Sequence, residues 1–163
     1  MKTEYILKPG IILSIAPEAA TIFSSYRQQD NAPEAGGILL GREYLNKEVR
    51  VELVTIPTSE DLAGPTWFER SHLKAQTIVD EAWNKSNGEM IYLGEWHTHP
   101  QNIPSPSSRD RAMIRNMRHE TMMEIDFLLL IIVGRTSEWI GIQTRSSLRQ
   151  LKLYEQNLRE QRT

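Results

Sequence analysis

The run from Gly94 to Pro100, GEWHTHP, constrains the fold of this 163-residue chain more than any other stretch. The apolar segment 90–93 leads into it and predicts a strand that continues into the two histidines. Side chains two residues apart on a strand lie on the same face, so we expect His97 and His99 side by side, about 7 Å apart at the backbone. Pro100 ends the strand, because proline has no amide hydrogen to donate to a neighbouring strand. The spacing therefore predicts two imidazoles that converge on one ion.

The segment 107–110, SSRD, has the form of a helix start. Ser107 is suited to cap the helix, and Asp110 stands three residues later, where acidic residues favour the first turn. A turn that returns toward the strand end would bring the Asp110 carboxylate to His97 and His99. Two neutral imidazoles and one carboxylate are a natural ligand set for zinc, with the fourth tetrahedral position left to water. These residues alone do not identify the base that a catalytic zinc also needs.

Composition limits the kinds of site and partner. The chain has no cysteine, which excludes disulfide scaffolds, cysteine-rich zinc sites and thiol nucleophiles. With 19 basic against 21 acidic residues, nothing points to nucleic acid or to an anionic membrane as a partner. The N-terminus lacks a hydrophobic signal core, and the longest apolar run, 127–133, is too short to span a bilayer, so we expect a cytoplasmic protein. The length fits one domain over residues 1–163.

Hydrophobic periodicity predicts alternating strands and helices. Strands are expected at 5–7, 11–15, 38–44, 48–56, 90–93 with its continuation into the histidines, 127–133 and 138–144, and helices at 17–27, 71–85 and from 107. Segment 57–65 is expected to be a loop. Segment 148–158 fits a helix or a strand, and its pattern does not choose between them.

Three aromatic residues near the histidines have two interpretations. Trp67, Phe68 and Trp96 could line a groove in which an extended substrate tail adds to an exposed strand. Alternatively they pack in the core or at its rim. The remaining histidines, His72 and His119, fall on predicted helices and are expected at the surface, outside any metal site.

Taken together, Glu34 ahead of a glycine-rich strand, the His97-x-His99-Pro100 run and Ser107-x-x-Asp110 resemble the JAMM motif of the JAB/MPN metallopeptidases in order and spacing. The resemblance implies an α/β fold: a single JAB/MPN domain of cytidine-deaminase-like architecture, with a mixed, mostly antiparallel sheet flanked by helices.

The resemblance also implies a role for each motif residue. His97, His99 and Asp110 would hold one zinc ion per chain. Glu34 would be the general base that takes a proton from water and delivers it to the leaving amine, and Ser107 would help to stabilise the oxyanion. Glu95, although on the same strand face as His97, is then expected to form a salt bridge or to lie behind the ligands.

Single-domain bacterial members of this family are similar to the deconjugating peptidases found beside ubiquitin-like conjugation systems, and the EWHTHP signature resembles the isopeptidases of CBASS anti-phage operons. This implies a protein substrate with an extended C-terminal tail, either a conjugated cGAS-like nucleotidyltransferase or a ubiquitin-like protein. Segment 57–70 is short beside the substrate-gripping insertions of deubiquitinases, so ubiquitin itself is not expected. Two alternatives stay open: a processing peptidase for a sulfur-carrier or other ubiquitin-like precursor, and a non-catalytic MPN scaffold.

Overall fold

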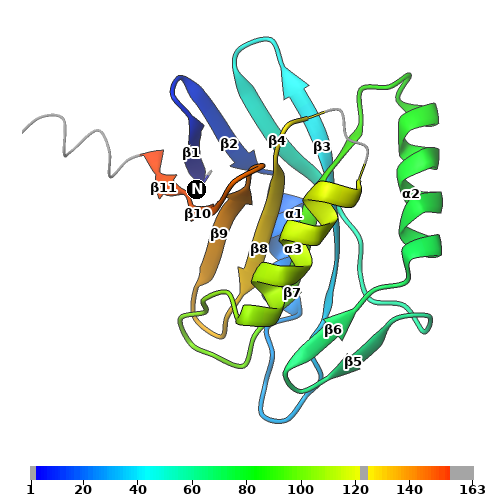
Figure 1. Ribbon diagram of the computed structural model, residues 1–163, viewed down its shortest axis with the longest axis vertical. Coiled ribbons are helices and arrows are strands. Elements are labelled where there is room, and N and C mark those ends of the chain that lie inside the picture. The colour runs from blue at the N-terminus through cyan, green and yellow to red at the C-terminus, as the bar shows by residue number, and fades with distance from the viewer. Residues whose placement is uncertain (1–2, 122–124, 155–163) are drawn as a thin grey trace, which may run out of the picture.

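One long sheet organises the computed structural model, which describes residues 3–121 and 125–154 (Figure 1). Within these residues the sheet has nine strands in the order β10-β9-β8-β7-β3-β4-β2-β1-β11. The strands are β1 (Glu4–Lys8), β2 (Ile11–Ile15), β3 (Gly36–Tyr44), β4 (Glu48–Val54), β7 (Ile91–Thr98), β8 (Leu128–Val133), β9 (Glu138–Gln143), β10 (Leu148–Gln150) and β11 (Lys152–Leu153). Neighbours are antiparallel except for two parallel pairs, β2 with β4 and β7 with β8. The mixed, mostly antiparallel sheet is as expected.

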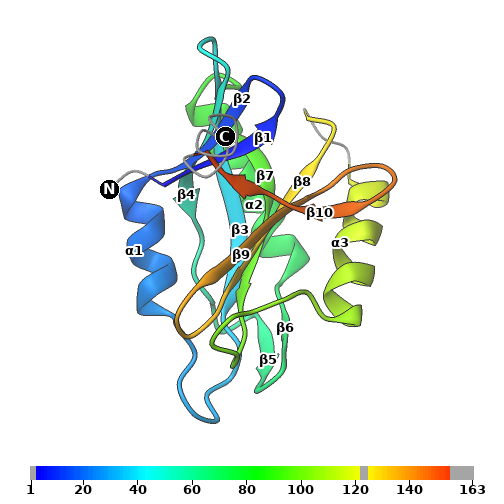
Figure 2. The ribbon, with the colours of Figure 1, turned by 90° about the vertical axis from the view of Figure 1, so that its left-hand side faces the viewer.

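Three helices occur among the described residues. Two of them lie on opposite faces of the sheet, α1 (Pro17–Ser25) on one side and α3 (Ser108–Glu120) on the other (Figure 2). The remaining helix, α2 (His72–Lys85), packs on the same face as α3, over β3 and β7. Helix α1 begins with a proline, whose fixed φ suits the first helical position. Among the described residues, no helix is both long enough and apolar enough to cross a membrane. The chain is a layered α/β domain with the sheet in the middle.

Strand β8 is buried on both faces, as its continuous apolar run predicts. Leu129 and Ile131 belong to the core on the α1 side, whereas Leu130 and Ile132 pack with α3. The strand lies beside β7 in the interior of the sheet, where His97 is opposite Ile132. The strand that carries the histidines is therefore held between two strands, β8 and β3, and has no free edge.

Trp96 belongs to the core and does not line a groove with its ring. The side chain is only 1% exposed, and its ring packs against Phe23 and Tyr26 with centroids 5.3 and 5.9 Å away. Its indole N–H donates a 2.9 Å hydrogen bond to the carbonyl of Thr55. Of the two interpretations, core packing is correct for Trp96, because strand alternation turns its ring to the face opposite His97.

Two segments add to the expectations. The predicted loop 57–65 contains a strand, β5 (Leu62–Gly64), which pairs with β6 (Trp67–Glu69) in a separate small sheet. Three-residue strands are too short to show an alternating pattern, so the sequence does not reveal this β5–β6 hairpin. The ambiguous C-terminal segment forms strands β10 and β11, and its residues 155–158 lie outside the described residues.

We predict that Trp96→Phe lowers the free energy of unfolding by about 1–3 kcal/mol, because it leaves the partly buried Thr55 carbonyl without its donor and loses packing area. Urea unfolding followed by circular dichroism measures the change. Trp83→Phe is the matched control: Trp83 is 39% exposed, so we expect a change within about 0.5 kcal/mol. Equal losses in the two variants would contradict the core assignment.

Candidate metal centre

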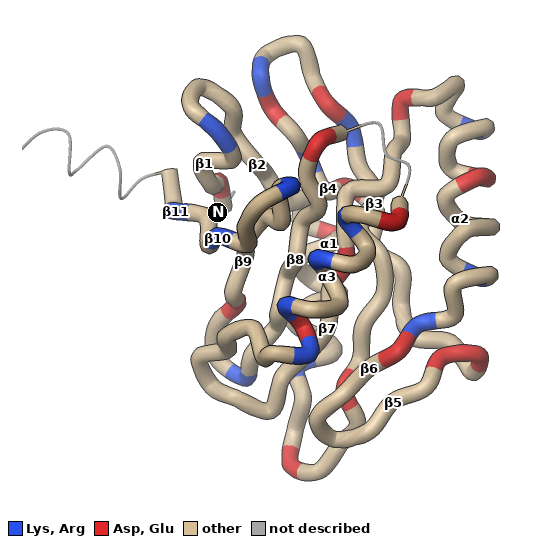
Figure 3. Tube along the Cα trace, viewed as in Figure 1, with Lys and Arg blue, Asp and Glu red and all other residues tan. Residues whose placement is uncertain are grey.

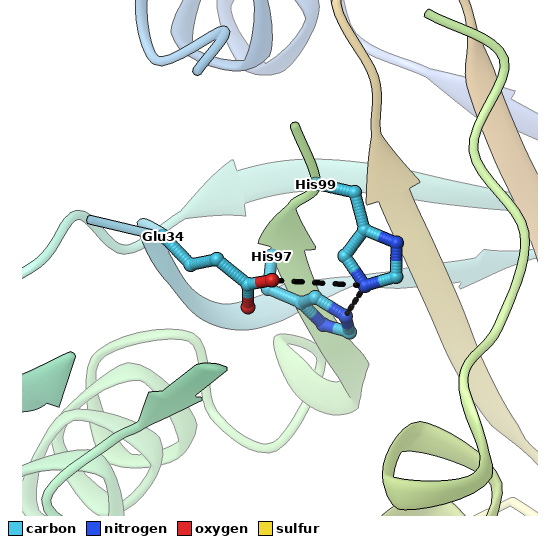
Figure 4. A group of neighbouring side chains, drawn as sticks. All are labelled: Glu34, His97 and His99. Atoms are coloured by element: carbon cyan, nitrogen blue, oxygen red, sulfur yellow. Dashed lines mark hydrogen bonds and ion pairs between the residues drawn. The ribbon is translucent and has the colours of Figure 1, made fainter. Parts of the chain in front are cut away.

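His97 and His99 present their rings to the same point at the end of β7 (Figure 4). Both residues are buried, their ring centroids are 5.0 Å apart, and the two Nε2 atoms are separated by 3.2 Å. The amide of His99 donates to the carbonyl of Val133 at 2.9 Å, which continues the β7–β8 pairing past the last strand residue. Both histidines are thus fixed by sheet backbone, with the convergence that their two-residue spacing predicts.

The start of α3 carries Asp110 to the same point. The amide of Asp110 donates to Ser107 Oγ at 3.1 Å, and the amide of Ser107 donates to Asp110 Oδ2 at 2.8 Å. This reciprocal capping box fixes the carboxylate at the helix end. Asp110 Oδ1 lies 3.0 Å from His97 Nε2, and Oδ2 lies 3.0 Å from His99 Nε2. One carboxylate therefore faces both imidazoles.

Glu34 approaches from the other side, just ahead of β3. Strand β3 pairs with β7 so that Gly36 lies opposite His97, which brings the preceding glutamate to the histidines. Its side chain is buried and points toward them in Figure 4, with Oε1 3.9 Å from His99 Nε2. Glu34, His97 and His99 together offer donor atoms within 4.8 Å of one another. The site thus holds two carboxylates, one in direct contact with the imidazoles and one about an ångström farther away.

The two carboxylates have opposite pKa shifts. Burial raises the pKa of Glu34 from 4.5 to about 7, although the nearby imidazoles act against this. For Asp110, burial also acts to raise the pKa, but hydrogen bonds from His97 and His99 outweigh it and hold the pKa well below its ordinary value. Paired carboxylates with divided pKa values are typical of sites that assign them different tasks.

The donor spacing fits a tetrahedral zinc ion. Bonds of about 2.0–2.1 Å in tetrahedral geometry separate neighbouring ligand atoms by about 3.3 Å. The distances of 3.0–3.2 Å between the two Nε2 atoms and the Asp110 oxygens are close to this value. Glu34, at 3.9 Å from the nearer histidine, lies outside that set. His97, His99 and Asp110 could therefore hold the ion, with Glu34 beside it.

Gln101 holds the His99 ring with a proton on Nδ1. Its Oε1 lies 3.2 Å from His99 Nδ1 and also accepts the amide of Ser105 at 3.3 Å, which identifies that atom as the amide oxygen. An acceptor facing Nδ1 requires Nδ1–H, and a neutral ring with its proton on Nδ1 offers the Nε2 lone pair to a metal. Without a metal, a proton on Nε2 serves instead in the hydrogen bond to Asp110. Sequence reasoning missed Gln101. Its place two residues after His99, behind a proline, is a weak signal that only the folded turn makes specific.

Glu95 forms a salt bridge with Arg70, as expected. Its buried carboxylate accepts a two-pronged pair from Arg70, with Nη2 2.8 Å from Oε1 and Nε 2.8 Å from Oε2, and also accepts the hydroxyl of Tyr92. A carboxylate held by three donors is not available to a reacting water. His72 and His119 are exposed on α2 and α3, as predicted.

A cavity of about 310 Å³ opens beside His97, between β6 and α3. Phe68, Met113 and Met117 give it apolar lining, and the guanidinium of Arg109 lies 5.5 Å over the ring of Trp67. Trp67 and Phe68 are half-buried in this region, which is compatible with either the groove or the rim interpretation for these two residues. In Figure 3, basic residues follow α3 while acidic residues occur around the β5–β6 hairpin. A larger cavity of about 900 Å³ lies between α1 and β1 and is lined by none of the site residues.

Comparisons with known proteins identify a family and a fold. A family model described as prokaryotic homologs of the JAB domain matches residues 17–148. A protein of Vibrio cholerae named CD-NTase/cGAS isopeptidase is 34% identical over 145 residues, covering 88% of this chain and 90% of the relative. A protein of the same name from Escherichia coli is 31% identical over 140 residues, covering 85% and 86%. The solution structure of a Desulfitobacterium hafniense protein superposes with a TM-score of 0.60 at 16% identity, covering 85% of this chain and 88% of that one, and supports the fold.

We predict that Gln101→Ala weakens zinc binding about 10–100-fold, since the His99 ring loses the acceptor that sets its tautomer and orientation. Competition with a chromogenic chelator measures the affinity without any assay of activity. Asn102→Ala, at an exposed neighbouring position, is expected to bind zinc as the parent does. Identical affinities in all three proteins would show that Gln101 does not support the ligand.

Proposed function

Because the chain belongs to the family of prokaryotic JAB-domain homologues, we propose that it is a zinc-dependent isopeptidase that releases a conjugated CD-NTase, a cGAS-like nucleotidyltransferase, from its target. Relatives that match most of the chain are named CD-NTase/cGAS isopeptidase, which supports a hydrolase. The same names support a role in reversing conjugation within a CBASS anti-phage system. The observation that carries the proposal is the meeting of two imidazoles and one carboxylate, with a second buried carboxylate 3.9 Å away.

We assign His97, His99 and Asp110 as the zinc ligands. The two Nε2 atoms lie 3.2 Å apart, and each lies 3.0 Å from a different oxygen of Asp110, whose carboxylate stays ionised because its pKa is lowered. Zinc bound there would supply Lewis acidity, which polarises the scissile carbonyl and lowers the pKa of water toward about 7. A non-catalytic MPN scaffold does not need a set of metal-binding side chains next to a buried carboxylate. The scaffold alternative therefore has less support than an enzyme.

Glu34 is assigned as the general base. Its carboxylate accepts a proton from the attacking water and then delivers it to the leaving lysine amine, so that one water is consumed and an acid and an amine are formed. Burial raises its pKa to about 7 against the opposing effect of the two imidazoles, and a neighbouring cation would lower the pKa again. The carboxylate is therefore basic at neutral pH and still close enough to that range to carry a proton.

Ser107 is assigned to the oxyanion. Its Oγ accepts the amide hydrogen of Asp110 at 3.1 Å, so the hydroxyl hydrogen remains free to donate. A donor aimed at the oxygen that gains charge during attack on an amide is a large catalytic contribution in hydrolases. Capping α3 and stabilising the oxyanion use different atoms of the hydroxyl, which makes the two roles compatible.

The substrate is proposed to enter as an extended C-terminal tail. The cavity beside His97 gives apolar surface from Phe68 and Met113 next to the donor set, where the acyl side of a cleaved bond could lie. The chain spans most of the length of its relatives named CD-NTase/cGAS isopeptidase, and this name supports a CD-NTase as the protein part of the substrate. A ubiquitin-like or sulfur-carrier precursor would use the same chemistry on a different tail.

We predict that Glu34→Gln keeps zinc but lowers turnover about 10²–10⁴-fold, the usual contribution of a general base. The substrate is a CD-NTase joined through its C-terminus to a lysine, and mass spectrometry checks that release leaves the native C-terminal residue. Glu43→Gln, at an exposed position of β3, is the matched control and should cleave normally. Full turnover by Glu34→Gln would sink the assignment of the base, and cleavage only of ubiquitin-like precursors would move the substrate to the processing alternative.

A second prediction concerns pH. Protonation of Glu34 removes the base, so kcat/KM should fall about tenfold per pH unit below an apparent pKa between 4.5 and about 7. Burial raises this apparent pKa above the ordinary value of a glutamate, and a bound zinc ion would lower it again. Zinc content measured at each pH separates loss of the metal from loss of the base. A rate that stays constant down to pH 4.5 with zinc fully bound would be inconsistent with a carboxylate base.

A further inference from the structure

Gln28 is a buried amide whose hydrogen bonds all end near Glu34. It follows α1, is only 2% exposed, and is neither a ligand nor part of the JAMM-like pattern. Its Nε2 donates to the carbonyl of Ala32 and to the carbonyl of Pro65, each at 2.7 Å. Its Oε1 accepts the hydroxyl of Thr98 at 3.3 Å. Both amide hydrogens and the amide oxygen are therefore in use.

The three partners of Gln28 come from the three segments that surround Glu34. Ala32 belongs to the loop that carries Glu34, Pro65 to the turn of the β5–β6 hairpin, and Thr98 to β7 between the two histidines. A deeply buried amide that joins three separate segments is costly to place and is held by its full set of partners. Gln28 is thus a junction between the base loop, the hairpin and the histidine strand.

The backbone around Glu34 is held by the same group of residues. The amide of Glu34 donates to the carbonyl of Gly64 at 2.8 Å, next to the Pro65 carbonyl that Gln28 binds. Ala35 exchanges two hydrogen bonds with Thr98: its amide donates to Oγ1 at 2.9 Å, and its carbonyl accepts the Thr98 amide at 2.8 Å. Thr98 Oγ1 therefore links Ala35 directly to Gln28.

The carboxylate of Glu34 has little else to locate it. Within the part of the chain that the structure describes, it makes no side-chain hydrogen bond, and its ion pair with His99 is 3.9 Å long. Its position relative to the histidines thus depends on the backbone of residues 32–35. Catalytic groups are sensitive to such placement, because a shift of about 1 Å can cost about 100-fold in rate.

We propose that Gln28 is a positioning residue that sets the distance of the Glu34 carboxylate from His97 and His99 by tying the base loop to the β5–β6 hairpin and to Thr98. This proposal rests on the proposed function, in which Glu34 is the base. It predicts that loss of the Gln28 amide acts on the rate through Glu34, with the zinc ligands left in place.

The experiment combines Gln28→Leu with Glu34→Gln in a double-mutant cycle. Gln28→Leu keeps a similar volume but removes the amide, so kcat should fall about 10–100-fold while KM and zinc content change less than about twofold. In the Glu34→Gln background the same substitution should cause almost no further loss, because the residue it positions is already absent. An equal loss in both backgrounds would overturn the proposal, since a general structural defect acts in either.

Hydrogen–deuterium exchange supplies a readout that needs no activity. The amides of Glu34 and Ala35 should exchange at least about tenfold faster in Gln28→Leu, while those of β8 stay protected. Gln29→Ala, an exposed neighbour of Gln28, should leave both the exchange and kcat unchanged. Unchanged exchange at Glu34 and Ala35 in Gln28→Leu would also overturn the proposal.

A second pair of variants covers the case in which Gln28→Leu does not fold. Thr98→Val removes the hydroxyl that joins Ala35 to Gln28, whereas Thr98→Ser retains it. Valine should reproduce the faster exchange and the lower kcat, and serine should restore both. A wild-type protein that cleaves no conjugate would refute the proposed function, while the exchange data would still decide whether Gln28 holds the loop.

Discussion

The antiparallel pairing of β3 with β7 is the constraint on which the site depends. It sets Gly36 opposite His97 and thereby brings Glu34, remote in sequence, against the two imidazoles. The pairing requires glycine at this point: a Cβ on Gly36 would lie 2.5 Å from the carbonyl oxygen of Trp96 and 2.7 Å from the ring of Phe68. The absence of a side chain therefore lets three layers meet, the base loop, the histidine strand and the β5–β6 hairpin.

The electrostatics of the site follow from how each buried acid is satisfied. The Asp110 carboxylate faces several donors and stays ionised, and that of Glu95 is paired with Arg70. The Glu34 carboxylate is buried without a hydrogen bond among the described residues, so its pKa rises. Burial is common to all three carboxylates and cannot by itself distinguish them. The number and kind of donors within reach distinguish the proposed ligand Asp110, the structural ion pair of Glu95 and the proposed base Glu34.

Local patterns made part of this site predictable. The two-residue spacing of the histidines and the capping box of Ser107 and Asp110 are properties of one strand and one helix turn, and both could be read from adjacent residues. Glu34 could be found only through the family resemblance, because its approach depends on strand pairing. Gln101 and Gln28 were missed for a related reason: an amide gains its meaning from partners on other segments, and no periodicity marks it.

The capping box joins the end of α3 to the donor set. Ser107 and Asp110 satisfy each other's backbone amides, and the same Asp110 oxygens face both histidines. Fraying of the first helical turn and movement of the Asp110 carboxylate away from the histidines are therefore a single opening event. A cation that binds only the intact site therefore stabilises the first turn of α3. Occupancy of the site and order at the start of the helix increase or decrease together.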